Sequence, residues 1–215
     1  MQTFGIYSAG GFAREVRGSL VAALGMVEQG DFQVVFIDDD PSQIGGVIHG
    51  SKVVSYEQFK TMENKRISIA FAAPTLRKEK AKIAAQDGID TFSITAPNHI
   101  LGDNVAIGRG AILASNSMIT ADAKIGDHFH CNIYSYVAHD CTVGDFVTFA
   151  PRVSLNGRVI VEDMVYIGSD ATILPGKEGA PLVIGEGAVI GAGAVVTKSV
   201  PSGAVMVGNP ARQRR

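Results

Sequence analysis

The sequence lacks the features that mark several classes of protein. Two cysteines among 215 residues are too few for the disulfide framework of a small secreted domain. Lysine and arginine number 19 against 21 aspartates and glutamates, so the chain has no basic excess of the kind that nucleic-acid-binding proteins show. These two absences favour a protein that needs no disulfides and binds no nucleic acid.

Long apolar runs and a signal sequence are missing as well. No stretch approaches the roughly 20 consecutive apolar residues that a membrane helix requires. The segment Met1–Ser8 carries none of the positively charged side chains that open a secretory signal. We therefore expect a cytoplasmic protein with no membrane partner, and a length of 215 residues leaves room for two modest domains.

A six-residue repeat dominates the second half of the chain. An apolar residue recurs at every sixth position for thirteen hexads, from Leu101 to Ile173. An α-helix cannot keep a period of six, and hairpins would need turn sequences that are missing. The repeat therefore predicts a parallel β-helix whose short strands each bury two side chains. The phase breaks for five residues after Ile173 and resumes at Ile184, which predicts a loop at one corner.

This array of apolar, glycine and small residues resembles the hexapeptide-repeat acyltransferases. The resemblance implies a left-handed β-helix shaped as a three-sided prism, in which three hexads make one coil and residues 18 apart stack. Cys131 and Cys141 fall on inward positions of the repeat, so we expect both to be small core residues.

The first 96 residues alternate between strand and helix patterns instead. Strand patterns lie at Gln2–Tyr7, Val34–Ile37, Ile67–Ala72 and Thr91–Ile94. Helical patterns lie at Phe12–Leu24, Ser55–Met62 and Thr75–Gln86. This order predicts an α/β domain with a small parallel sheet over residues 1–96, followed by the left-handed parallel β-helix over residues 97–215.

Two short segments of the α/β domain suit a nucleotide. Gly10 and Gly11 stand between the first strand and the first helix, where glycines let the backbone approach a phosphate and the helix N-terminus offers free N–H groups. Asp38 and Asp39 follow the second strand, where carboxylates can bind ribose hydroxyls or the edge of a base. A plain tight turn and a solvated acidic turn before Pro41 are the alternatives, and both stay open here.

His139 is the exception in the repeat, because it places an imidazole where the neighbouring hexads have turn residues. Gly157 lies 18 residues later, and a glycine stacked on the ring leaves room for a ligand beside an N–H group. His139 can then act as a general base for acyl transfer, with Asp140 holding its tautomer and Gly157 stabilising the oxyanion. The alternative is an ordinary surface histidine at a corner.

His128 and His130 raise a second possibility. Some trimeric left-handed β-helix proteins bind zinc through three histidines and hydrate carbon dioxide, and imidazole ligands suit zinc. However, these two residues belong to a different side of the prism from His139, so a zinc site would need a neighbouring subunit. We expect no metal.

The two halves together resemble a narrower group, the bacterial nucleotide-sugar acetyltransferases. This group includes UDP-4-amino-sugar N-acetyltransferases of the bacillosamine type and sialic acid O-acetyltransferases. The segments that carry the resemblance are Ser8–Phe12, Ile37–Asp39, Asn132–Asp140 and Gly208–Ala211.

The resemblance implies three sets of site residues. The catalytic residues would be His139, Asp140 and Asn132. The residues that bind the nucleotide sugar would be Gly10, Gly11, Phe12, Asp38 and Asp39. The residues that contact acetyl-CoA would be Thr148, Gly157, Ser169 and Ala192. Phe12 and Thr148 each stand where the family can have a histidine, which leaves the substrate open.

The resemblance also implies the reaction. The acetyl group of acetyl-CoA would pass directly to the amino group of a nucleotide-linked amino sugar, such as a UDP-4-amino-4,6-dideoxy sugar. Outward apolar residues such as Tyr136 and Met118 favour self-association, and the family implies a homotrimer. The alternatives are sugar O-acetylation, zinc-dependent carbon dioxide hydration and a non-enzymatic scaffold.

Overall fold

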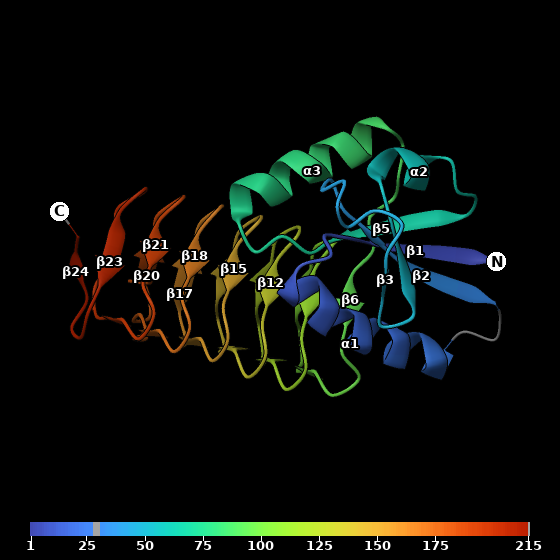
Figure 1. Ribbon diagram of the computed structural model, residues 1–215. Helices are drawn as coiled ribbons and strands as arrows, with labels where there is room; N and C mark the ends of the chain where they lie inside the picture. Colours follow the sequence, from blue (N-terminus) through green and yellow to red (C-terminus); the bar gives the residue numbers. More distant parts are fainter. Residues whose placement is uncertain (28–30, 215) are drawn as a thin grey trace.

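The computed structural model describes residues 1–27 and 31–214, which form an α/β domain and a long β-helix (Figure 1). The α/β domain lies at one end of the β-helix and along one of its sides, and the chain then winds away from it to the C-terminus. Within the described residues, no helix combines the length and the apolar character that crossing a membrane requires.

The α/β domain contains a five-stranded sheet in the order β3-β4-β2-β1-β5. Its strands are β1 (Gln2–Tyr7), β2 (Phe32–Ile37), β3 (Val47–Ile48), β4 (Ser51–Val54) and β5 (Lys65–Ile69). All neighbours are parallel except β3 and β4, which form an antiparallel hairpin at one edge. The predicted parallel sheet is therefore wrong at this edge, where the sheet is mixed, and neither β3 nor β4 was predicted.

Three helices cover the sheet, and they lie where the sequence predicts them. They are α1 (Gly11–Val27), α2 (Tyr56–Lys60) and α3 (Pro74–Gln86). Ser55 caps α2 in a reciprocal pair with Gln58, and Pro74 opens α3 at a position where its missing N–H costs nothing. Helix α1 packs on one face of the sheet, and α2 and α3 pack on the other.

The β-helix has three sides, each a ladder of short parallel strands. The first side contains β6 (Ile94–Thr95), β9 (Ile112–Leu113), β12 (His130–Cys131), β15 (Thr148–Phe149), β18 (Tyr166–Ile167), β21 (Val189–Ile190), β23 (Val205–Val207) and the antiparallel β24 (Arg212–Gln213). The second side contains β7 (Ile100–Leu101), β10 (Met118–Ile119), β13 (Tyr136–Val137), β16 (Ser154–Leu155), β19 (Thr172–Ile173) and β22 (Val195–Val196). The third side contains β8 (Ala106–Ile107), β11 (Lys124–Ile125), β14 (Thr142–Val143), β17 (Val159–Val161) and β20 (Leu182–Ile184).

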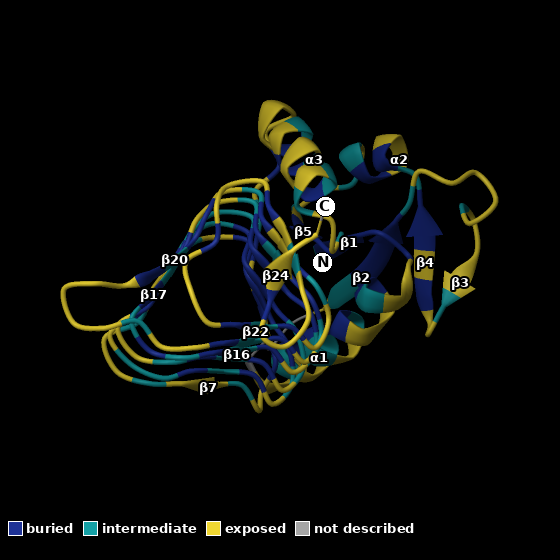
Figure 2. Cartoon of the chain, turned by 90° about the vertical axis from the view of Figure 1, so that its left-hand side faces the viewer, coloured by how far each residue is buried: buried dark blue, intermediate teal, exposed yellow. Residues whose placement is uncertain are grey.

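The core of the β-helix follows the predicted hexads. Cys131 is 0 % and Cys141 is 1 % exposed, which confirms that both point inward. Val159 pairs with Leu182, a separation five residues longer than in the preceding coils, and this confirms the insertion. The inserted loop projects from the corner between the second and third sides (Figure 2). Leu101 was predicted to point into the core but is 54 % exposed, because β7 is the edge strand of its ladder.

The two domains share part of their cores at the junction. Of the predicted strand Thr91–Ile94, Thr91 makes a single bridge to Ile67, and Ile94 begins β6, which pairs with β9 of the β-helix. Ile94 and Ile112 also belong to the cluster of buried residues that α1 forms on the sheet. The α/β domain is therefore packed directly on the first side.

Candidate active site

His139 lies in the turn between β13 and β14, at the corner that joins the second and third sides. Its Nδ1 is 2.7 Å from Oδ2 of Asp140, and the two side chains are 51 % and 44 % exposed. Asp140 has a left-handed backbone (φ 58°), which aspartate tolerates. With an Nδ1–H donated to the carboxylate, the Nε2 lone pair is left free to accept a proton.

Two side chains contact the Asp140 carboxylate. Besides the contact with His139, Nη2 of Arg158 lies 3.5 Å from the same Asp140 oxygen. The hydrogen bond from His139, and then the charge of Arg158, hold the pKa of Asp140 below its usual range. The carboxylate therefore stays ionised and can stabilise a protonated imidazole.

Gly157 lies directly above the imidazole, as the 18-residue stacking predicts. A Cβ added at Gly157 would lie 2.6 Å from Cε1 and 2.7 Å from Nε2 of His139, so any side chain there would collide with the ring. One coil further, the N–H of Gly176 donates to the carbonyl of Gly157 at 3.0 Å. Small residues thus keep the imidazole accessible along this corner.

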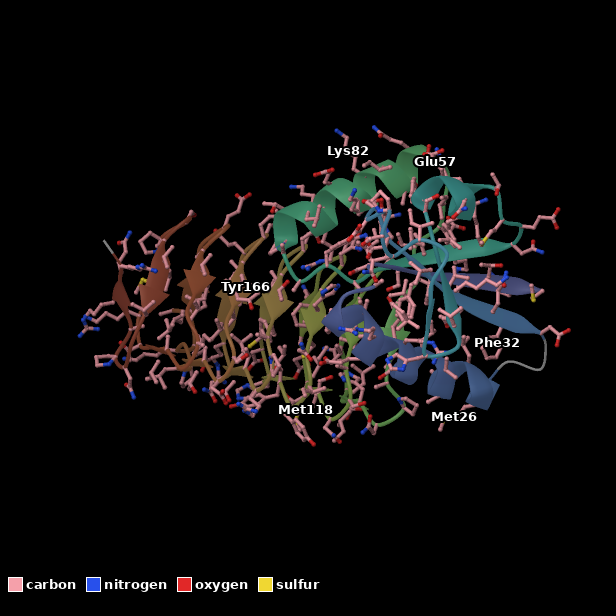
Figure 3. All side chains as sticks on the ribbon, viewed as in Figure 1. Met26, Phe32, Glu57, Lys82, Met118 and Tyr166 are labelled. Carbon is pink, nitrogen blue, oxygen red and sulfur yellow. The ribbon has the colours of Figure 1, made fainter. Side chains whose placement is uncertain are left out.

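A second group of predicted residues meets at the opposite edge of the second side. Phe12, Asn132, Thr148 and Ser169 line one small cavity of about 130 Å³ between α1 and the first side. The hydroxyl of Thr148 donates to the carbonyl of Ala72 at 2.8 Å, so it also links the two domains. Figure 3 labels Tyr166, which lines the same cavity from β18. Ala192 follows β21 further along this corner and is exposed.

The predicted nucleotide segments surround the start of α1. Gly10 donates its N–H to Oγ of Ser8 at 3.0 Å, and Gly11 is the first residue of the helix. Ala9 donates its N–H to Oδ2 of Asp38 at 2.8 Å, so Asp38 holds the glycine turn against the end of β2. The N–H groups of the first helical turn face away from the helix body, where an anion would bind.

Asp39 is tied to α3 rather than to the glycine turn. Tyr7 donates its hydroxyl to Oδ1 of Asp39 at 3.0 Å, and Nζ of Lys80 is 2.7 Å from Oδ2. Burial, and then the nearby Asp39 carboxylate, raise the pKa of the Tyr7 hydroxyl above its usual value, so Tyr7 stays a donor. Both carboxylates therefore hold the loops around the proposed nucleotide site in place, Asp38 through the N–H of Ala9 and Asp39 through Tyr7 and Lys80.

The structure thus divides the predicted residues into two half-sites. His139, Asp140 and Gly157 form the base half-site, at the corner between the second and third sides. Phe12, Asn132, Thr148 and Ser169 line the pocket half-site, at the corner between the first and second sides. The full width of the second side separates them within one chain.

The geometry disagrees with a zinc site built from His128, His130 and His139. His130 has both ring nitrogens engaged, because Nε2 is 3.1 Å from the carbonyl oxygen of Ile69 and Nδ1 is 3.3 Å from Nη1 of Arg77. The ring of His128 stacks on Phe146, with centroids 4.9 Å apart. Within the described part of the chain, no three His, Cys, Asp or Glu residues gather as metal ligands.

Arg77 is a buried residue that sequence analysis missed. It is 0 % exposed and lies in α3, on the same face as the buried Ala81 and Ala84. All but one of its hydrogen bonds go to main-chain carbonyls, which leave no motif in a sequence. The available signal was an arginine at the i, i+4, i+7 spacing of the helix's small apolar residues.

Comparison with known proteins finds the repeat and a full-length relative. Residues 158–198 match the family model described as the hexapeptide repeat of succinyl-transferase. The GDP-perosamine N-acetyltransferase of Escherichia coli O157:H7 is 40 % identical over 222 residues, covering 100 % of this chain and 97 % of that protein.

Two solved structures resemble the chain along its full length. WeeI from Acinetobacter baumannii AYE has a TM-score of 0.93 and 40 % identity, with 100 % of both chains covered. A histidine-to-asparagine variant of perosamine N-acetyltransferase from Caulobacter crescentus, in complex with CoA and GDP-perosamine, has a TM-score of 0.89 and 26 % identity, covering 100 % of this chain and 98 % of that one. Fold and full-length similarity agree, and the chain belongs to the hexapeptide-repeat nucleotide-sugar N-acetyltransferases, a family with a left-handed β-helix.

Proposed function

We propose that the protein transfers the acetyl group of acetyl-CoA to the amine of a nucleotide-linked amino sugar, at a site shared between neighbouring copies of a homotrimer. The observation that carries the proposal is the pair of half-sites at opposite edges of one side of the β-helix. A base and an acceptor pocket that do not meet in one chain would meet if the second side packed against a neighbouring copy.

The chemistry assigned to the base half-site is direct transfer. His139 Nε2 takes a proton from the sugar amine as the amine nitrogen attacks the thioester carbonyl carbon. The C–S bond then breaks, and the CoA thiolate takes the proton back from the His139 imidazolium and leaves as the thiol. Asp140 stabilises the imidazolium, and the N–H of Gly157 stabilises the oxyanion.

The cysteines favour this route over an acyl-enzyme. Burial raises the pKa of the Cys131 thiol to about 12, and burial also raises the pKa of Cys141. Thiols that stay protonated and face the core are poor nucleophiles. This favours direct attack of the sugar amine on acetyl-CoA.

The second side has the composition of an interface between copies. Its outward positions form one ladder, in which each residue pairs with the next coil. These positions hold no charged residue and are Ile100, Met118, Tyr136, Ser154, Thr172 and Val195. An uncharged, largely apolar strip suits burial against another copy. Ser169 and Ala192 of one copy would then line the acetyl-CoA groove together with Gly157 of its neighbour.

The α/β domain would supply the nucleotide sugar. Gly10, Gly11 and Phe12 would hold the diphosphate at the start of α1, and Asp38 and Asp39 would hold the nucleoside. The sequence resemblance favours UDP, whereas two relatives carry GDP-perosamine in their names. We place GDP first and UDP second as the carrier of a 4-amino sugar.

A thiol-release assay with acetyl-CoA tests the proposal. The acceptors are GDP-, UDP- and dTDP-linked 4-amino sugars, and the matched control is each sugar with a hydroxyl in place of the amine. We expect release only with amines and an acetylated product that hydroxylamine does not cleave, because hydroxylamine cleaves esters and spares amides. Release with the hydroxyl sugars would favour O-acetylation. No release with any acceptor, or a monomeric mass by light scattering, would overturn the proposal.

A further inference from the structure

The strongest unexplained feature outside the two half-sites is the guanidinium of Arg77, which bonds to both domains at once. On the α/β side it donates to the carbonyl oxygens of Phe71 at 2.6 Å and Ala72 at 3.2 Å. On the β-helix side Nη2 donates to the carbonyl oxygen of Phe146 at 2.6 Å, and Nε donates to that of His128 at 3.0 Å. A single side chain therefore joins the end of β5 to two turns at the corner between the third and first sides.

Two side chains of the first side complete this connection. Because Nε2 of His130 donates to the carbonyl of Ile69, Nδ1 carries the lone pair that accepts from Arg77. Thr148 donates to the carbonyl of Ala72. Arg77, His130 and Thr148 form what we call the junction cluster. It fixes the carbonyls of the segment Ile69–Ala72, where the chain leaves the sheet.

The junction cluster is costly to bury. Loss of water around the guanidinium lowers the pKa of Arg77 to about 9. Among the described residues, the ion pairs include no carboxylate partner for this arginine. An apolar side chain would fill the same volume without this cost, but it could not select one orientation of the two domains.

The junction cluster also forms part of the wall of the pocket half-site. The ring of His130 lies against Phe12, with centroids 5.2 Å apart. His130, Thr148 and Ala72 all line the cavity that contains Asn132. A rotation of the α/β domain on the β-helix would therefore move Phe12 relative to Asn132.

We propose that Arg77 is a positioning residue, which sets the α/β domain on the β-helix so that the sugar amine reaches the acetyl group. The proposal rests on the proposed function, because it assigns the nucleotide sugar to one domain and acetyl-CoA to the other. Without Arg77, the nucleotide would keep its contacts in the α/β domain, and acetyl-CoA would keep its contacts on the β-helix. The alignment of the two reacting atoms would be lost, and a displacement of about 1 Å can cost roughly a hundredfold in rate.

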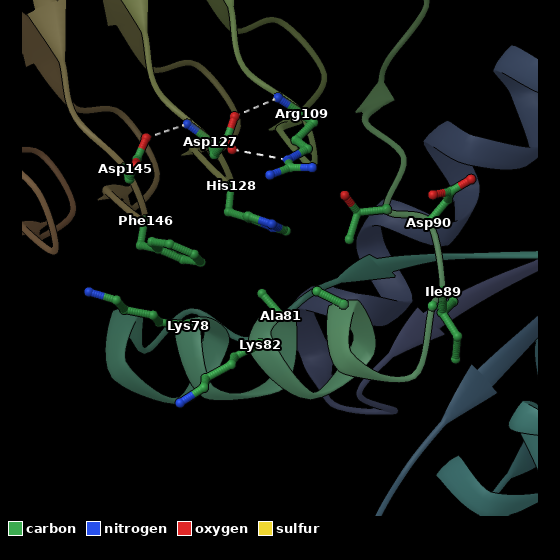
Figure 4. A pocket seen from close by; sticks show the side chains of 13 residues that line it. Lys78, Ala81, Lys82, Ile89, Asp90, Arg109, Asp127, His128, Asp145 and Phe146 are labelled. Carbon is green, nitrogen blue, oxygen red and sulfur yellow. Dashed lines mark hydrogen bonds and ion pairs between the residues drawn. The ribbon is translucent and has the colours of Figure 1, made fainter.

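The test compares Arg77→Lys and Arg77→Met with Arg109→Met. Arg109 is the control, because its Nε pairs with Asp127 at 3.1 Å between two turns of the β-helix, and its hydrogen bonds among the described residues all stay within the β-helix (Figure 4). Figure 4 also shows that these turns lie beside α3, so the control samples the same corner. The measurements are kcat, KM for each substrate, and the folded fraction by circular dichroism at the assay temperature.

We expect kcat to fall roughly tenfold or more in Arg77→Lys, with both KM values within about twofold of the parent. Lysine keeps the charge but has too few donors for all the carbonyls, so Arg77→Met should fall further. Arg109→Met should keep its kcat. A folded Arg77→Lys with unchanged kcat would overturn the proposal. A decrease in kcat no larger than the decrease in the folded fraction would also overturn it.

Hydrogen exchange separates this proposal from the proposed function. Peptides covering Ile69–Ala73 should exchange faster in Arg77→Lys than in Arg109→Met, whether or not the parent acetylates any sugar. Equal exchange in the two variants would refute the junction role. An inactive parent with this exchange difference would refute the acetyl transfer and leave the junction role standing.

Discussion

The two half-sites differ in how much of the molecule supports them. The base half-site is about half exposed and depends on the contacts among His139, Asp140 and Arg158. The pocket half-site is walled by both domains, and its strand residues His130 and Thr148 are 1 % and 3 % exposed. The difference fits the proposed shared site, in which the acceptor pocket is formed within each chain and the base lies on an open edge that another copy completes.

Removing the base should give the largest effect. His139→Ala should lower kcat roughly a hundredfold or more, because the amine then has no positioned proton acceptor. KM for the nucleotide sugar should hold, since the pocket half-site is intact. Steady-state kinetics on the variant and on His49→Asn, an exposed histidine of the β3–β4 turn, check this. Full activity of His139→Ala would remove the base half-site from the account.

Crowding the base should come next. Gly157→Ala places a methyl group 2.6 Å from where Cε1 of His139 now lies, so the ring must turn. We expect kcat to fall roughly ten- to a hundredfold. Gly18→Ala is the control, because a Cβ at Gly18 meets no atom within 4 Å. An unchanged kcat in Gly157→Ala would contradict the claim that catalysis depends on the present orientation of the His139 ring.

The partner of the base should matter less than the base. Asp140→Asn keeps the left-handed turn but removes the negative charge, and we expect kcat to fall about tenfold, because solvent weakens an exposed pair. The lowered pKa of Asp140 adds a pH prediction. In the parent, protonation of this carboxylate should not reduce kcat/KM until the pH falls below the usual range near 4. A loss of kcat in Asp140→Asn as large as in His139→Ala would contradict this ranking.

The last predicted effect is on stability rather than on kcat, and it comes from the buried histidines beside the junction. Burial lowers the pKa of His128 to about 4 and holds that of His130 well below its usual value. The unfolded chain takes up these protons near pH 6.5 and the folded chain does not. Stability is therefore retained above about pH 6.5 and lost as the pH falls toward 4, by up to about 1.4 kcal/mol per pH unit for each histidine.

The variant His128→Asn tests this acid sensitivity. Asparagine accepts the left-handed backbone at this position (φ 54°) and does not titrate. Thermal unfolding at pH 7 and pH 5 should show a smaller drop in Tm for the variant than for the parent. An equal drop would exclude His128 as a source of the acid sensitivity.

The sequence predicted the repeating part of the molecule far better than the parts that occur once. The burial of Cys131 and the stacking of Gly157 on His139 both follow from the phase of the hexad, which every coil repeats. In a repeat, the place of a residue within its hexad decides whether its side chain points inward or outward, so no distant part of the sequence is needed to predict it. The fold and the base half-site were therefore within reach of pattern analysis.

Contacts that occur only once in the molecule could not be predicted from the repeat. Arg77 donates hydrogen bonds to carbonyls more than fifty residues away, and because every residue has a carbonyl, the residue types at those positions do not predict these bonds. The β3–β4 hairpin had one weak sequence signal, Gly50, which we did not use. The two residues of its turn, His49 and Gly50, both have positive φ, as in a type I′ turn, where glycine is favoured. The separation of Asn132 from His139 follows from the three sides, but only the folded α/β domain shows which edge carries the pocket.

The most direct test of the shared site is to mix two variants that are each inactive. His139→Ala lacks the base, and Ser169→Phe fills the pocket half-site. If the site joins His139 of one copy to the pocket of its neighbour, about a quarter of the sites in randomly mixed trimers regain both halves. Every trimer that contains both variants has one complete site in three, so mixed trimers purified through a tag on each variant should recover up to about a third of the parent kcat per site. Mixed trimers no more active than the two variants alone would contradict the shared site.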